Sequence, residues 1–171
     1  MAYSFCLTLD AATDAAVRSI WQQLAAEGIC NHMVTLDYVP HVSLAVLDDE
    51  PPRETVEAAL AAMRSVRALT VRLGGVRSFE GTTIAWLAVE GGDALEAMHS
   101  HLMAHLPIDK VRAHYQPGLW TPHVTLQMEG DVARGMAAIS HSWPERRAAR
   151  IDALDLVQVP PVVVLNRIKL Q

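Results

Sequence analysis

The chain has 171 residues, of which 51% are hydrophobic and 19% charged, so it can bury a core and is too apolar to stay disordered. Its formal net charge is −5 and no basic run is present, which excludes a tight, non-specific grip on long duplex nucleic acid. A small nucleotide or an RNA end remains compatible with this charge, because a pocket needs only local positive charge.

The N-terminal segment and the cysteines point to a cytoplasmic protein. Residues 1–10 lack the basic start of a signal peptide, and no apolar run reaches the roughly 20 residues of a membrane span. Cys6 and Cys30 have no metal-type spacing, and we interpret them as buried free thiols, with a single redox bridge as the alternative. We expect a monomer with no membrane partner.

The first half is expected to alternate strands and helices. Apolar residues at i, i+3, i+4 and i+7 predict a helix over 12–27, with Asp10 or Thr13 as its cap and Gly28 at its end. The other elements expected here are strands at 3–9, 33–37 and 41–47, a helix opened by Pro51-Pro52, and a strand at 69–73 with a further extended piece to Phe79.

The second half repeats this order. A strand is expected at 84–89, then a helix capped by Asp93 and ended by Pro107, and an irregular stretch at 109–121. The remaining elements expected are a strand at 123–128, a helix from Asp131 with Pro144 beyond it, and two final strands at 150–159 and 162–170.

This repetition indicates an internal duplication. His41 and His123 are 123 − 41 = 82 residues apart, close to half the chain. We therefore expect one domain over 1–171, with repeat halves of approximately 1–80 and 81–171. The predicted fold class is α+β, with two pseudo-symmetric lobes, each an antiparallel sheet with flanking helices, and a cleft between them.

Two short runs carry the candidate chemistry, and both read Pro-His-Val-(Ser/Thr)-Leu. The first run holds His41 and Ser43, and the second holds His123 and Thr125. Because proline cannot donate a ladder hydrogen bond, each histidine should begin a strand. Side chains alternate along a strand, so His41, Ser43 and Ala45 should share one face, as should His123, Thr125 and Gln127.

Two imidazoles and two hydroxyls around one cleft suit in-line substitution at phosphorus. One neutral histidine can take a proton and one protonated histidine can give one, while the hydroxyls donate to the non-bridging oxygens. No metal or other cofactor is expected. A single His-x-Ser on a strand is ordinarily structural, but two equivalent copies in a repeated topology favour function over a duplicated structural strand.

These motifs resemble those of the 2H phosphoesterases, which include the 2′-5′ RNA ligase-like proteins. The stretch from Tyr115 to His123 is also similar to the approach to their second motif. The resemblance implies a bilobal fold and metal-free cleavage of 2′,3′-cyclic or related phosphodiesters, with reverse RNA ligation possible in principle. It implies that His41 and His123 are catalytic and that Ser43 and Thr125 bind phosphate.

Several other side chains are weaker candidates. Tyr115 and Trp120 could stack a nucleobase or instead close the core under their loop. Tyr38 is a weaker stacking candidate, and Phe79 and Arg77 could line the cleft. His99, His101 and His105 are interpreted as exposed residues of an amphipathic helix, although 101 and 105 have a spacing that can chelate a metal.

Three functions compete at this point. The first is a metal-independent phosphodiesterase acting on a small nucleotide or an RNA end. The second is a non-catalytic nucleotide-binding module on the same cleft. The third is a metal-dependent hydrolase that uses the helix histidines.

Overall fold

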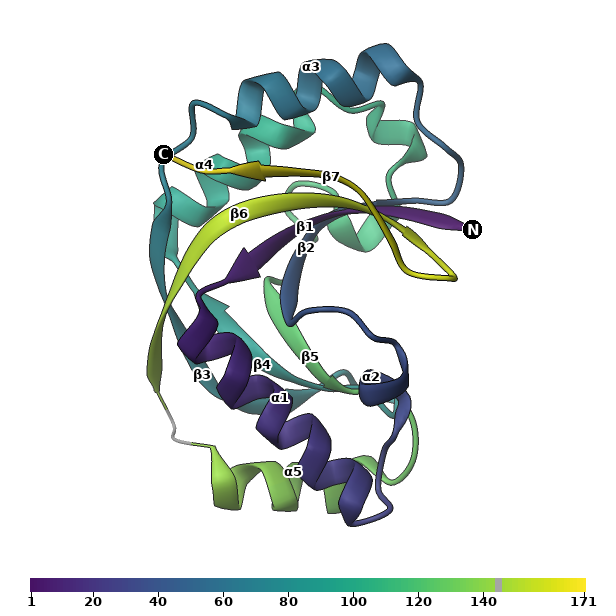
Figure 1. Ribbon diagram of the computed structural model, residues 1–171, viewed down its shortest axis with the longest axis vertical. Helices are drawn as coiled ribbons and strands as arrows, with labels where there is room; N and C mark the ends of the chain where they lie inside the picture. Colours follow the sequence, from purple (N-terminus) through teal and green to yellow (C-terminus); the bar gives the residue numbers. More distant parts are fainter. Residues whose placement is uncertain (144–145) are drawn as a thin grey trace.

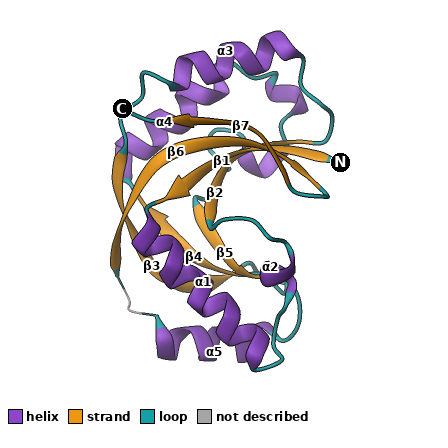
Figure 2. Ribbon diagram, in the orientation of Figure 1, coloured by secondary structure: helices purple, strands orange, loops and turns teal. Residues whose placement is uncertain are grey.

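The computed structural model describes residues 1–143 and 146–171, which fold into helices packed on a curved sheet (Figures 1 and 2). The helices are α1 (Ala11–Ala26), α2 (His32–Thr35), α3 (Arg53–Met63), α4 (Gly92–Met103) and α5 (Val132–Ser142), with 3₁₀ turns η1 (Ile108–Lys110) and η2 (Ala113–Tyr115). The strands are β1 (Ala2–Leu9), β2 (His41–Leu47), β3 (Leu69–Ser78), β4 (Ala85–Glu90), β5 (His123–Gln127), β6 (Arg147–Val159) and β7 (Val163–Lys169).

The strands form one antiparallel sheet in the order β2-β1-β6-β3-β4-β5, with β7 also paired to β6. The α+β fold class and the antiparallel pairing are thus confirmed. The expected pair of sheets is joined into one hydrogen-bonded path, because the 13-residue β6 pairs with β1 along one part and with β3 along another.

The strand order is symmetric about the β6–β3 pair. If β1, β2 and β3 are exchanged for β4, β5 and β6, the order reads the same from either edge. The halves also interlock. Strand β1 of the first half lies beside β6 of the second half, and β3 of the first half lies between β6 and β4 of the second half.

Helices α1 and α4 likewise pack on elements of the opposite half of the chain. Helix α1 of the first half packs on α5 and β5, whereas α4 of the second half packs on β2 and α3. Figure 1 shows the result, with α3 and α4 above the sheet and α1 and α5 below it. Each end of the molecule therefore contains helices and strands from both halves of the chain.

Three expected elements differ from the structure. Residues 33–37 are not a strand but contain most of α2, because Met33 alone is fully buried there and a short apolar run does not discriminate a helical turn from a strand. Helix α4 is capped by Gly91, two residues before the expected Asp93. The expected break at residue 73 is a bulge at Gly74-Gly75 within β3. The expected Pro144 lies outside the described residues.

Helix α1 begins as its sequence predicts. The Asp10 carboxylate accepts hydrogen bonds from the backbone N–H of Thr13 at 3.0 Å and from that of Arg150 at 2.7 Å, so one side chain both caps α1 and anchors β6. Both cysteines are buried and free. Within the described residues, none of the helices has the length and apolar character to cross a membrane.

Candidate functional site

Strands β2 and β5 are the two edges of the sheet path, and its curvature brings these edges into contact with each other. A hollow of about 250 Å³ lies there. Its lining includes all four motif side chains: His41, Ser43, His123 and Thr125. Residues from opposite halves of the chain thus converge on one cavity.

A β-bulge follows each motif, which changes two of the expected orientations. The register of β1 against β2 passes from Ser43 directly to Ala45, and the register of β4 against β5 passes from Thr125 directly to Gln127. The two bulges lie at equivalent places, since 44 + 82 = 126. Because each bulge inserts one extra residue, the side chains that follow it point to the opposite face of the sheet from the one that strict alternation predicts.

Ala45 and Gln127 consequently do not share the face of the motif residues, contrary to expectation. Both are fully buried, and the Gln127 amide lies against Gly135 of α5 on the core side of the sheet. Val46 and Met128 take the positions that line the hollow. Periodicity alone could not show this, because a bulge depends on pairing with a neighbouring strand.

Both histidine rings are oriented by the same local contact. The Nδ1 of His41 lies 2.8 Å from the Val39 carbonyl oxygen, and the Nδ1 of His123 lies 2.7 Å from that of Thr121. When Nδ1 carries the proton it donates to this carbonyl, which leaves Nε2 free for chemistry.

Two buried indoles brace the motif strands from outside the sheet. Trp120 Nε1 donates to the Ser43 carbonyl oxygen at 2.9 Å, and Trp21 Nε1 donates to the Thr125 carbonyl oxygen at 3.2 Å. Because β2 and β5 are edge strands, these carbonyls would otherwise lose a partner on burial. Each brace comes from the opposite half of the chain.

Replacing Trp120 or Trp21 by phenylalanine should reduce the free energy of unfolding by about 1–3 kcal/mol, because a buried acceptor is left without its donor. Denaturant unfolding measures this change. Trp86→Phe is the matched control, since the buried Trp86 Nε1 has no hydrogen-bond partner among the described residues. Equal losses in all three variants would show that ring packing, rather than the indole bonds, holds these strands.

The surroundings of His41 are polar and acidic. Tyr38 packs beside it, with ring centroids 4.9 Å apart, and donates its hydroxyl proton to the fully buried Asp155 at 2.8 Å. Arg167 holds the same carboxylate through two hydrogen bonds of 2.6 and 2.7 Å. Cys6 lies opposite Ser43 on β2 and opposite Asp155 on β6.

These neighbours shift the pKa of His41. Burial lowers the pKa of His41, but the Cys6 sulfur, the Val39 carbonyl and the Asp155 carboxylate outweigh burial and hold that pKa above its ordinary value. The imidazolium form of His41 is therefore more stable than that of an ordinary histidine.

The surroundings of His123 are aromatic. Phe79 and Trp86 stand edge-on to the His123 ring, with centroids 5.2 and 5.7 Å away. Trp86 and Arg77 occupy the register positions that Cys6 and Asp155 occupy beside His41. Burial lowers the pKa of His123, and the nearby His41 and His114 lower it further, against the Thr121 carbonyl. His123 therefore favours the neutral form.

A second hollow of about 370 Å³ adjoins the first on the side of His123. The two share Arg112, Tyr115, His123, Thr125 and Met128. Phe79, Ile84 and Leu119 give the second hollow apolar walls, while Thr82, Thr121 and His114 add polar groups. The site can therefore hold a group larger than a phosphate.

The weaker candidates separate in the structure. Tyr115 and Tyr38 line the hollow with the histidines, and Phe79 lines the adjoining one. Trp120 lines neither: it is buried and stacks on His99, with ring centroids 4.1 Å apart. Of its two interpretations, Trp120 thus fits the core-closing one. Arg77 lies over the Trp86 ring at 6.0 Å, outside both linings.

His99 was expected to be exposed, but it is almost fully buried. It lies on the apolar stripe of α4 between Leu95 and Leu102, under the loop that carries Trp120, and its Nε2 contacts the Tyr115 carbonyl at 2.8 Å. His101 and His105 lie with ring centroids 5.6 Å apart. Among the described residues, no three His, Cys, Asp or Glu side chains gather as potential metal ligands.

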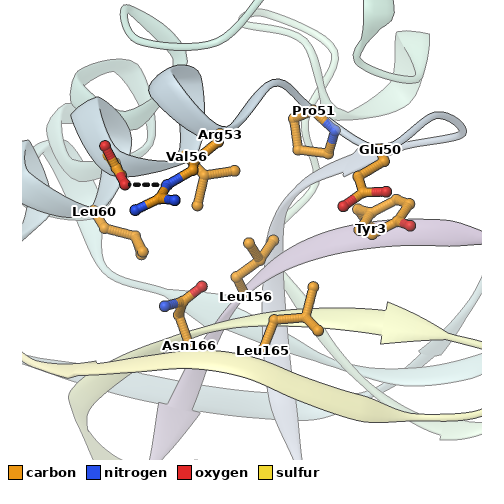
Figure 3. Close-up of a pocket in the computed structure, with 10 residues that line it drawn as sticks. Tyr3, Glu50, Pro51, Arg53, Val56, Leu60, Leu156, Leu165 and Asn166 are labelled. Atoms are coloured by element: carbon orange, nitrogen blue, oxygen red, sulfur yellow. Dashed lines mark hydrogen bonds and ion pairs between the residues drawn. The ribbon is translucent and has the colours of Figure 1, made fainter.

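A separate hollow of about 390 Å³ lies between α3 and strands β6 and β7, and contains none of the motif residues (Figure 3). Leu60, Leu156 and Leu165 form its apolar walls. At its edge Arg53 pairs with Glu57 at 2.6 Å. This part of the molecule offers charged residues that take no part in the motif hollow and can serve as controls.

Sequence reasoning missed four contributors to the site. Asp155 could have been noticed in the sequence, since it is the one acidic residue in the apolar run from Leu154 to Val157, which is buried. Trp21 looked like an ordinary member of an apolar stripe, and Cys6 like a small core residue. Arg112 lies in an irregular stretch without periodicity.

A model of the 2′-5′ RNA ligase superfamily matches residues 13–159 of the chain. No sequence among the curated proteins matches it. Similar folds occur among solved structures: LigT of E. coli in complex with 3′-AMP has a TM-score of 0.62 at 15% identity, covering 99% of this chain and 97% of that one.

Two further structures support the same fold. The protein TT0787 of Thermus thermophilus has a TM-score of 0.59 at 20% identity, covering 99% and 98% of the two chains. Usb1 of Kluyveromyces marxianus has a TM-score of 0.55 at 16% identity, covering 99% and 97%. The likeness extends over essentially the whole chain in each case.

Proposed function

The chain belongs to the 2′-5′ RNA ligase superfamily, and on that premise we propose that it is a metal-independent phosphodiesterase that hydrolyses 2′,3′-cyclic or 2′-5′-linked phosphodiesters of nucleotides or RNA ends. The observation that carries this proposal is the convergence of His41, Ser43, His123 and Thr125 on one hollow of about 250 Å³. LigT in complex with 3′-AMP supports a nucleotide as the ligand class.

In the proposed reaction the two histidines have different roles. His123, whose pKa is lowered, takes a proton from the attacking water, and His41, whose pKa is raised, gives a proton to the leaving oxygen. The Ser43 and Thr125 hydroxyls donate hydrogen bonds to the non-bridging oxygens, where charge increases in the transition state. The cleaved bond is the P–O bond to the leaving oxygen, and the new bond joins phosphorus to the water oxygen.

A substrate panel tests this function directly. The protein is incubated in excess chelator with 2′,3′-cyclic nucleotides and with 2′-5′-linked dinucleotides, and products are separated by chromatography. We expect turnover that the chelator leaves unchanged. Turnover that requires an added metal would contradict the mechanism, and binding without turnover of any member would favour the nucleotide-binding module.

The pH dependence of kcat/KM should be a broad bell. Activity falls at low pH as His123 gains a proton, with a pKa below the ordinary value, and falls at high pH as His41 loses one, with a pKa above it. Asp155→Asn removes a negative charge that favours imidazolium at His41, so the alkaline limb should move to lower pH while the acidic limb stays in place.

Asp14→Asn is the matched control for this experiment. Asp14 pairs with Arg18 at 2.7 Å on α1 and lines neither hollow of the site, so its loss should move neither limb. If Asp155→Asn lowers activity equally at every pH, then Asp155 supports the fold alone and the assignment of His41 as the acid loses this support.

A further inference from the structure

Arg112 is fixed at the rim of the site by its backbone. Its N–H donates to the Val46 carbonyl oxygen at 2.9 Å, and the preceding Val111 forms a bridge with Leu47, so the segment extends the edge of β2. The Arg112 side chain lines both hollows, at the place where they adjoin. It thus lies beside the motif residues without belonging to either motif.

Arg112 supplies a permanent positive charge that the site otherwise lacks. Among the described residues that line the two hollows, it is the only arginine or lysine. The chain as a whole carries a formal net charge of −5, so an anionic ligand depends on local cations. A guanidinium also binds phosphate through paired hydrogen bonds, which an imidazolium cannot do.

Asp48 pairs with this guanidinium. The Oδ1 of Asp48 accepts hydrogen bonds from Arg112 Nε at 2.9 Å and from Arg112 Nη2 at 2.6 Å. The pair is exposed, with 41% of the Arg112 side chain and 69% of the Asp48 side chain accessible. Such exposed pairs contribute little to stability, so an incoming anion can replace the carboxylate at small cost. Asp48 itself lines neither hollow, which places the charged end of Arg112 at the edge of the cavity.

We propose that Arg112 forms a second anion subsite, which binds a non-scissile phosphate of the substrate and selects nucleotides that carry one. The inference rests on the proposed function, because it assumes that the first phosphate lies among the four motif side chains. Asp48 competes with the substrate for Arg112 and so limits the preference.

Binding of two nucleotides tests the subsite without requiring turnover. Adenosine 3′-monophosphate and adenosine 3′,5′-bisphosphate differ only in the second phosphate, and calorimetry gives the dissociation constant of each. The wild-type protein should bind the bisphosphate at least about tenfold more tightly, as expected for a charge-assisted hydrogen bond. Arg112→Gln should abolish this preference, and Asp48→Asn should increase it.

Arg53→Gln is the matched control, since it removes the same charge and also breaks an exposed ion pair, but at the α3 hollow of Figure 3. It should keep the wild-type preference. Equal affinity of the wild-type protein for both nucleotides, or a preference that survives Arg112→Gln, would overturn the inference. The proposed function is tested separately, because its failure would be monophosphate binding that does not change in His41→Ala or His123→Ala.

Discussion

Replacing His41 or His123 by alanine should lower turnover of a cleaved phosphodiester by at least about 10²-fold, because each variant loses one of two proton transfers. The measurement is kcat on the best substrate of the panel, at the pH optimum of the wild-type protein. Both rings are only half-buried and their Nδ1 atoms contact local carbonyls, so the fold should persist in both variants. Circular dichroism and thermal unfolding check that it does.

The double variant separates a catalytic pair from two independent effects. Residues that act in one chemical step are strongly non-additive, so the double variant should be little slower than the slower single variant. His101→Ala is the matched control, since His101 is exposed on α4 and its Nε2 contacts the Ala62 carbonyl at 3.3 Å. Near-normal turnover in either single variant would refute the acid–base roles.

Removing a motif hydroxyl should lower kcat by about 10²-fold, the usual cost of one hydrogen-bond donor that acts on transition-state charge. Ser43→Ala and Thr125→Val are the variants of choice, because valine keeps the shape of threonine without its hydroxyl. The effect should fall on kcat more than on KM, since the charge on the non-bridging oxygens grows during the reaction.

Ser43→Thr and Thr125→Ser are the controls for these hydroxyls. Both keep a donor in place, so both should retain most of the activity. Ser43 also lies 3.4 Å from the Ser4 hydroxyl and 3.8 Å from the Cys6 sulfur, so unfolding measurements must accompany the kinetics. If the hydroxyl-free variants keep their kcat, the phosphate lies elsewhere in the hollow.

The sequence predicted the parts of the fold that depend on local patterns. Proline before each histidine placed the start of β2 and β5, and the apolar stripe of α1 placed that helix to within a residue or so. The repeat of the motif at an 82-residue interval identified four side chains that the structure brings to one hollow.

Properties that depend on pairing between distant strands could not be read in the same way. The bulges after Ser43 and Thr125 depend on the register with the neighbouring strand. The alternation of side chains along one strand therefore could not predict that Ala45 and Gln127 are buried. The different environments of the two histidines arise from β6 and β3, which lie more than 100 and about 45 residues from His41 and His123, respectively. Because the two motifs are nearly identical, they did not reveal that the pKa values of His41 and His123 shift in opposite directions.

The exchange of elements between the halves has a consequence for the origin of the protein. In a single copy of the repeat, β3 would lose both of its partner strands, β4 and β6, and α1 would lose its contacts with α5 and β5. Such a precursor could bury these surfaces only by joining a second identical chain about a twofold axis, with one histidine from each partner. Fusion of the two genes would then have freed each copy to diverge, so that an acidic neighbour could arise beside one ring and aromatic neighbours beside the other.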